Sequence, residues 1–185
     1  LPKDIEDILL QIGCSQDKIF KGEPERITSL KVGRGTGRHN DLLLEQEKEI
    51  VVGIEAKADE TFGKNISEEL ATEDISQNKI NRINTLYKNL YGCDIASGTD
   101  IRYQLLTGVS GTLLEAKAKN IQKALFLIIT FKKEGSYNKE KLKSNIKDID
   151  IFINSLDKNK ANNAYKFEAY KDVELYIKHI EIDVK

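Results

Sequence analysis

The chain has 185 residues, of which 39% are hydrophobic, 32% are charged and two are proline. This length and composition fit one globular domain with a hydrophobic core and exclude a disordered chain, so we expect a single domain over residues 1–185. The 29 basic and 30 acidic residues give a net charge of −1, which excludes a uniformly basic coat for nucleic acid.

The chain shows no signal for a membrane or an oxidising compartment. Its longest apolar run, residues 124–130, is far shorter than the roughly 20 residues of a membrane span. The first residues, from Leu1 to Asp4, lack the basic and apolar regions of a signal peptide. Cys14 and Cys93 are far apart and form no disulfide or zinc pattern, so we expect a cytoplasmic protein without a membrane partner.

Hydrophobic periodicity predicts an alternation of helices and strands. A helix is expected over residues 4–13, followed by a turn-rich stretch over 14–39. Two apolar runs, 41–45 and 50–57, flank a short charged stretch and predict an antiparallel hairpin. Further patterns predict helices within 65–91, 101–119 and 139–156, a buried strand over 124–131 and an alternating strand over 173–182. These elements together predict an α/β domain with a mixed β-sheet.

The hairpin brings two acids and a lysine together at one end. If it turns around Lys48, Asp41 lies opposite Glu55, and Glu55 shares one strand face with Lys57. Two neighbouring carboxylates repel each other unless a cation lies between them, and Mg²⁺ prefers such oxygen ligands. A lysine beside a metal-bound water can orient that water or help to deprotonate it. The pattern therefore predicts a Mg²⁺ site at Asp41 and Glu55, with Lys57 next to it.

The short acid-x-Lys pattern is weak by itself in such a charged chain. It occurs three times, at Glu55–Lys57, Glu115–Lys117 and Asp183–Lys185. The first alone ends an apolar strand whose hairpin partner begins with an acid. The alternative is a solvated ion pair of Glu55 and Lys57 on an exposed sheet face, with Asp41 as a turn aspartate. A lysine in an apolar strand is costly without a partner, which favours the catalytic interpretation.

At these residues the sequence resembles the PD-(D/E)xK nuclease superfamily. The resemblance lies in residues 41–44 (DLLL) and 54–57 (IEAK). It extends to runs that look like those of a group of uncharacterised bacterial proteins in this superfamily, namely residues 54–63 (IEAKADETFG), 102–106 (RYQLL) and 125–131 (LFLIITF). The proline that often precedes the first acid of the motif is replaced by Asn40, which removes no ligand.

The resemblance implies a restriction-endonuclease-like mixed β-sheet flanked by helices. It also implies a Mg²⁺-dependent nuclease that hydrolyses phosphodiester bonds in nucleic acid, and we expect DNA as the substrate. Asp41 and Glu55 would bind Mg²⁺, with Mn²⁺ as a substitute, while Lys57 assists the attacking water. Gln104 matches a glutamine that several members carry near the site. Because some members have lost catalysis, the alternative is an inactive module that binds nucleic acid or a partner protein.

Other polar residues are candidates for contacts with the nucleic acid. Arg34, Arg38 and Arg102 are candidate phosphate contacts, although a plain loop explains the first two equally well. His39 is a candidate proton carrier or a solvated loop residue, and Glu60 is a candidate supporting residue or helix cap. A basic group suits either a DNA-facing surface or a solvated helix face: Lys132, Lys133, Lys139, Lys141, Lys143 and Lys147. The resemblance also allows a homodimer, since many such nucleases dimerise to cut both strands.

Overall fold

The computed structural model describes residues 1–15, 20–30, 37–133 and 137–184. Within them, one mixed sheet of seven strands runs in the order β1-β2-β3-β4-β7-β6-β5. The strands are β1 (Phe20–Thr28), β2 (Arg38–Gln46), β3 (Ile50–Lys57), β4 (Lys123–Lys133), β5 (Lys160–Ala161), β6 (Ala164–Tyr165) and β7 (Glu174–Val184). The helices are α1 (Lys3–Gln11), α2 (Ile66–Leu70), α3 (Gln77–Tyr91), α4 (Tyr103–Ala118) and α5 (Lys139–Ser155), with short 3₁₀ turns η1 (Asp157–Asn159) and η2 (Glu168–Tyr170).

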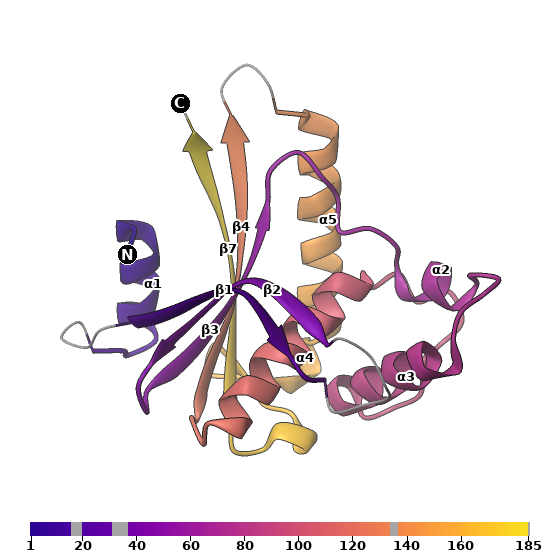
Figure 1. Cartoon of the computed structure of the whole chain (residues 1–185), viewed down its shortest axis with the longest axis horizontal. Coiled ribbons are helices and arrows are strands. Elements are labelled where there is room, and N and C mark those ends of the chain that lie inside the picture. The colour runs from indigo at the N-terminus through magenta and orange to yellow at the C-terminus, as the bar shows by residue number, and fades with distance from the viewer. Residues whose placement is uncertain (16–19, 31–36, 134–136, 185) are drawn as a thin grey trace.

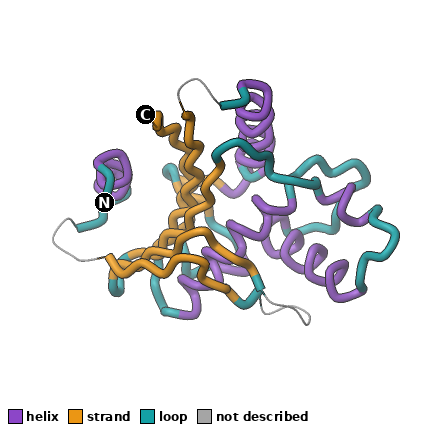
Figure 2. Tube along the Cα trace, turned by 45° about the horizontal axis from the view of Figure 1, so that its top comes forward, coloured by secondary structure: helices purple, strands orange, loops and turns teal. Residues whose placement is uncertain are grey.

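The sheet combines an antiparallel meander with parallel strands. β1, β2 and β3 pair in antiparallel fashion, whereas β4 is parallel to both β3 and β7. Figure 1 shows α1 on one side of this sheet and α3, α4 and α5 on the other, and Figure 2 shows the strands between them. The covered central strand β4 is buried over residues 124–130, as its apolar sequence predicts. The predicted mixed α/β sheet flanked by helices is confirmed.

The two faces of the sheet belong to different hydrophobic clusters. Val51 and Phe126 pack with α3, α4 and α5, whereas Val52 and Leu125 pack with α1. Side chains alternate along a strand, so Glu55 continues the row that begins with Val51. Glu55 therefore lies on the face that α4 covers.

Two glycines allow α4 to approach the sheet closely. A Cβ atom on Gly53 of β3 would lie 2.1 Å from the hydroxyl oxygen of Thr112 on α4. A Cβ atom on Gly108 of α4 would lie 2.5 Å from the ring of Phe126 on β4. Gly108 therefore permits close packing of α4 on β4.

Two predicted boundaries are wrong for local reasons. The helical pattern over residues 65–91 is divided into α2 and α3, because Ser76 accepts a hydrogen bond from the backbone of Lys79 and starts a new helix. The turn-rich stretch contains the edge strand β1, which is mostly exposed and so carries no apolar alternation. Pro24 lies within β1, where an edge strand tolerates a missing backbone donor.

Within the part of the chain that the structure describes, no helix is both long enough and apolar enough to cross a membrane.

Candidate active site

The β2–β3 hairpin has the register that the sequence predicts. Leu42 pairs with Ile54, and the ladder continues to Gln46 and Ile50 at the turn. Next to this ladder, Asp41 Oδ2 accepts a hydrogen bond of 2.7 Å from the backbone N–H of Ala56. The carboxylate of Asp41 thus lies beside the strand segment that carries Glu55 and Lys57, and its residue remains exposed.

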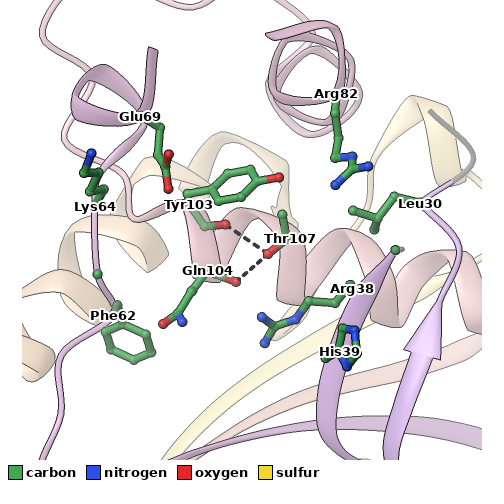
Figure 3. Close-up of a pocket in the computed structure, with 12 residues that line it drawn as sticks. Leu30, Arg38, His39, Phe62, Lys64, Glu69, Arg82, Tyr103, Gln104 and Thr107 are labelled. Atoms are coloured by element: carbon green, nitrogen blue, oxygen red, sulfur yellow. Dashed lines mark hydrogen bonds between the residues drawn. The ribbon is translucent and has the colours of Figure 1, made fainter. Parts of the chain in front are cut away.

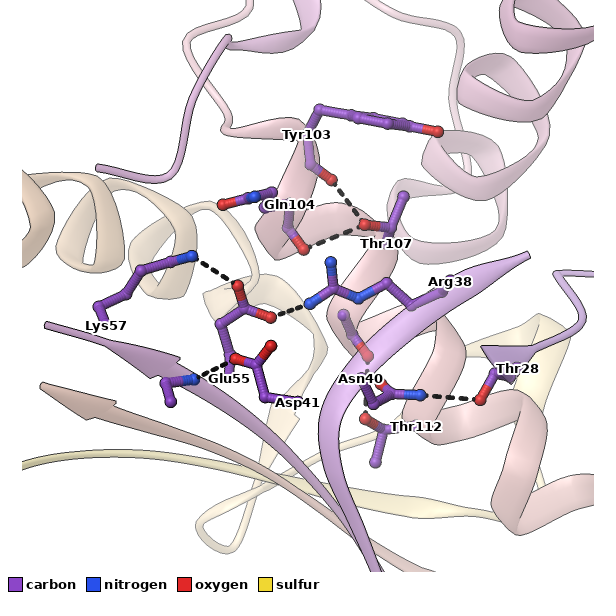
Figure 4. Close-up of polar contacts among 12 residues, drawn as sticks. Thr28, Arg38, Asn40, Asp41, Glu55, Lys57, Tyr103, Gln104, Thr107 and Thr112 are labelled. Atoms are coloured by element: carbon purple, nitrogen blue, oxygen red, sulfur yellow. Dashed lines mark hydrogen bonds and ion pairs between the residues drawn. The ribbon is translucent and has the colours of Figure 1, made fainter. Parts of the chain in front are cut away.

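Glu55 lies between two cations in a buried environment. Its Oε1 atom is 2.8 Å from Lys57 Nζ, and its Oε2 atom accepts a hydrogen bond from the guanidinium of Arg38. Figure 4 shows these contacts. The side chains of Glu55 and Lys57 are only 3% and 4% exposed, so a solvated ion pair on an open sheet face is wrong. We refer to Arg38, Glu55 and Lys57 as the Glu55 cluster.

Lys57 is held by two further contacts on the loop after β3. Its Nζ atom is 3.3 Å from Glu60 Oε1 and 5.4 Å from the centroid of the Phe62 ring. The side chain of Glu60 is 63% exposed, so Glu55 is the buried counter-ion and Glu60 is a weak one. These contacts hold the ammonium next to Glu55.

Burial and the nearby charge of Asp41 have opposite effects on the pKa of Arg38. Removal from water lowers the pKa of its guanidinium from the ordinary value, and the charge of Asp41 opposes that effect. Arg38 is therefore a desolvated cation next to both predicted metal ligands. Its Nε atom is buried without a hydrogen-bond partner among the described residues.

Gln104 and Arg102 have different environments although both begin α4. The Oε1 atom of Gln104 is buried and makes no hydrogen bond within the described residues, and Figure 3 shows the amide between Phe62 and Arg38. Arg102, in contrast, has its Nε atom 2.9 Å from Asp148 Oδ2 and donates a 2.8 Å hydrogen bond to the carbonyl of Gly63. These protein partners favour a structural role for Arg102 over the predicted phosphate contact.

The other predicted nucleic-acid contacts are dispersed. Arg34 lies outside the described residues. His39 is exposed at the edge of the site. Lys132 is 3.1 Å from both Glu181 and Asp183, so its charge is compensated on the sheet.

Helix α5 positions the loop that follows β3. Lys141 donates a 2.8 Å hydrogen bond to the carbonyl of Asp59, and Asn145 donates a 2.8 Å hydrogen bond to the carbonyl of Glu60. Asn145 is buried, and no motif in the sequence marks it as part of the site. Lys139, Lys143 and Lys147 of the same helix are exposed.

A cavity of about 350 Å³ opens beside the Glu55 cluster. It lies between the start of β2, the loop after β3 and the helices α3 and α4 (Figure 3). Its polar lining includes Arg38, Lys64, Arg82, Tyr103 and Gln104. The sequence does not reveal Lys64 or Arg82 as site residues, because they come from separate elements and share no motif. Tyr103 belongs to the run 102–106 (RYQLL), but the sequence alone gives it no role.

The donor set of this site fits Mg²⁺ better than zinc. Among the described residues, no group of three or more His, Cys, Asp or Glu side chains is arranged to hold a metal ion. Mg²⁺ needs fewer protein ligands, since one or two carboxylates together with water and substrate phosphates are enough. Asp41 and Glu55 provide two carboxylates across adjacent strands. A Mg²⁺ ion at Glu55 would compete with Arg38 for the Oε2 atom.

Comparisons with known proteins yield one match. A family model described as a domain of unknown function, DUF6946, matches residues 1–184. A search of curated proteins and a search of solved structures each gave no significant match.

Proposed function

We propose that this chain, which belongs to the DUF6946 family, is a Mg²⁺-dependent nuclease of restriction-endonuclease-like type that hydrolyses phosphodiester bonds in DNA. The observation that carries the proposal is the buried Glu55–Lys57 pair at the end of β3, with Asp41 beside it across the hairpin. A buried acid and lysine at a strand end, next to a cavity, are the kind of arrangement that catalytic sites use. The mixed sheet flanked by helices is the scaffold that the proposal requires.

Each residue of the site has a distinct role in this proposal. Asp41 and Glu55 hold Mg²⁺ or Mn²⁺, which when bound supplies positive charge at the scissile phosphate and a more acidic water. Lys57 orients the attacking water, because its Nζ atom lies 2.8 Å from Glu55 Oε1 and is fixed on the same strand face. Gln104 offers an amide without a protein partner among the described residues, which suits a hydrogen bond to substrate or water.

The test is DNA cleavage by the full chain with Mg²⁺ or Mn²⁺. We expect Lys57→Ala to reduce the rate by roughly 10²–10⁴-fold, the usual range for loss of a group that assists proton transfer. Lys117→Ala is the matched control, since Lys117 belongs to another acid-x-Lys pattern and lies exposed on α4. Thermal unfolding of each variant shows that the fold is retained. Cleavage that persists in Lys57→Ala, or that continues in the presence of a chelator, contradicts the mechanism.

A second candidate function is an inactive module that keeps the fold and binds nucleic acid or a partner protein. The observation that favours it is the contact of both Glu55 oxygens with protein cations, which neutralises this acid without a metal. Calorimetric titration with Mg²⁺ separates the two candidates. A nuclease binds the ion and loses affinity in Asp41→Asn, whereas the inactive module gives no metal-dependent heat in either protein.

A further inference from the structure

The cavity beside the Glu55 cluster is lined by a positively charged side chain, Arg82, that has no counter-ion among the described residues. Arg82 projects from α3 toward the cavity, as Figure 3 shows, and its Nε atom is buried without a hydrogen-bond partner. No ion pair joins Arg82 to any described acid. The residue is half-buried, and a guanidinium that lines a cavity without a counter-ion suits an anionic ligand.

The other charges around the cavity have partners. Glu69 is 2.6 Å from Lys79, so this acid does not cancel the charge of Arg82. Lys64 donates a 3.1 Å hydrogen bond to Thr72, and its residue is exposed at the rim. Arg38 is paired with Glu55. The lining therefore has an excess of positive charge, which is centred on Arg82. The planar guanidinium suits a phosphate, because it can donate two parallel hydrogen bonds.

The cavity also has a flat aromatic wall and a free amide. Tyr103 lines it from the start of α4, and Lys79 Nζ lies 5.2 Å from the centroid of its ring. Gln104 presents an amide whose Oε1 atom is buried and makes no hydrogen bond within the described residues. An aromatic ring next to basic side chains is typical of sites for unpaired bases, and an amide can pair with the edge of a base. A simple phosphate ion would leave both features unused.

The size and position of the cavity further limit the class of ligand that can bind there. Its volume of about 350 Å³ is near the lower end of pockets for small organic ligands, which cover about 300–1,000 Å³. Arg38 lines the cavity and also contacts Glu55, so a bound group would lie next to the proposed metal site. A base within a duplex is stacked and paired and cannot enter such a cavity.

We propose that the cavity between β2, α3 and α4 binds a single unpaired nucleotide, with its phosphate on Arg82 and its base against Tyr103 and Gln104. The placement of this nucleotide next to a scissile bond rests on the proposed nuclease function, whereas the binding itself does not. The substrate class is then single-stranded DNA or a frayed end.

The experiment measures binding of thymidine 5′-monophosphate to the full chain by calorimetry in the presence of EDTA. We expect Arg82→Gln to weaken binding by about tenfold or more, the effect of losing one charge-assisted hydrogen bond. Lys88→Gln is the matched control, because it removes one positive charge from the exposed side of the same helix, outside the cavity. Arg82→Lys, which keeps the charge, is expected to bind with intermediate affinity.

A second comparison tests the aromatic wall. Tyr103→Leu is expected to weaken binding of the mononucleotide and to leave binding of inorganic phosphate unchanged. Single-stranded oligonucleotide should compete with the mononucleotide, and blunt duplex should not. Equal affinity for the mononucleotide and inorganic phosphate, or equal affinity in Arg82→Gln and wild type, overturns the inference. Mononucleotide binding without any DNA cleavage supports the nucleotide site and contradicts the proposed nuclease function. Cleavage without mononucleotide binding supports the nuclease function and contradicts the nucleotide site.

Discussion

Replacement of Glu55 by glutamine removes the counter-ion of two buried cations. Lys57 and Arg38 have side chains that are 4% and 11% exposed, and both contact this carboxylate. Breaking a buried ion pair by removing one partner typically costs about 3–5 kcal/mol, because the remaining charge is left desolvated. We therefore expect Glu55→Gln to lower the free energy of unfolding by about that amount.

Urea unfolding of matched variants measures this cost. The control is Asp94→Asn, because Asp94 lies 3.6 Å from Lys88 in a pair whose side chains are 93% and 66% exposed. Such a pair contributes about 0–1 kcal/mol. The double variant Glu55→Gln/Lys57→Met should be more stable than Glu55→Gln, since it no longer buries the lysine charge. If Glu55→Gln unfolds within about 1 kcal/mol of Asp94→Asn, the idea of a desolvated cluster is refuted.

Three further predictions follow from other parts of the structure. Mg²⁺ at a hundred times its dissociation constant should stabilise the wild type by about 2.7 kcal/mol, which is seen as a higher midpoint of thermal unfolding. The midpoint of Asp41→Asn should not change on addition of Mg²⁺. Gly108→Ala should cost about 1–3 kcal/mol in urea unfolding because its Cβ would lie 2.5 Å from the ring of Phe126, whereas Gly111→Ala, 3.4 Å from its nearest side-chain atom, should cost less than 1 kcal/mol. Burial lowers the pKa of His179 from 6.5, against the opposing charges of Glu181 and Asp150, so the unfolded chain binds the proton more readily. Stability should therefore fall as pH decreases below about 6.5, and His179→Gln should reduce that fall in thermal unfolding at pH 5 and pH 7.

The hairpin could be predicted from the sequence because it is local. Two apolar runs around a short charged turn specify the pairing of β2 with β3, and that pairing places Asp41 beside Glu55 and Lys57. The buried strand β4 and the amphipathic helix α5 could be predicted for a similar reason. The apolar run of β4 and the helical spacing of apolar residues in α5 each lie in one continuous segment. The strand β1 could not, because an exposed edge strand has no apolar face to reveal it.

The partners of the site residues depend on tertiary contacts, which short patterns do not encode. Arg38 is in a glycine-rich stretch that suggests a loop, yet it starts β2 and pairs with Glu55 seventeen residues later. Arg82 is on the polar side of a helix pattern, and only the packing of α3 near α4 places it at the cavity. Arg102 was predicted as a phosphate contact, but it forms an ion pair with the buried Asp148 of α5.

The charged residues are distributed unevenly along the chain. Residues 1–100 carry 13 basic and 19 acidic side chains and residues 101–185 carry 16 and 11. Among the basic residues of the second part, Lys132 is paired on β7 and Lys141 is tied to the loop after β3, whereas Lys139, Lys143 and Lys147 are exposed on α5. The cations next to the candidate site, Arg38, Lys57 and Arg82, all come from the acidic first part. The overall charge split is therefore no guide to which cations lie next to the candidate site.

Arg38 is shared by the proposed metal site and the cavity, since it contacts Glu55 and also lines the cavity. Its guanidinium occupies Glu55 Oε2, so Mg²⁺ can use that oxygen only if the arginine moves away. The cavity that Arg38 lines offers it a new anionic partner as soon as a nucleotide phosphate is bound there. Binding of a nucleotide should then make Glu55 more available to the metal, and metal binding should favour the nucleotide to the same extent, because such coupling is reciprocal. Calorimetric titration with Mg²⁺ in the presence and absence of thymidine 5′-monophosphate measures this coupling, and equal metal affinities in the two conditions contradict it. In Arg38→Gln the metal should bind more tightly and independently of the nucleotide, because its competitor for Glu55 is gone.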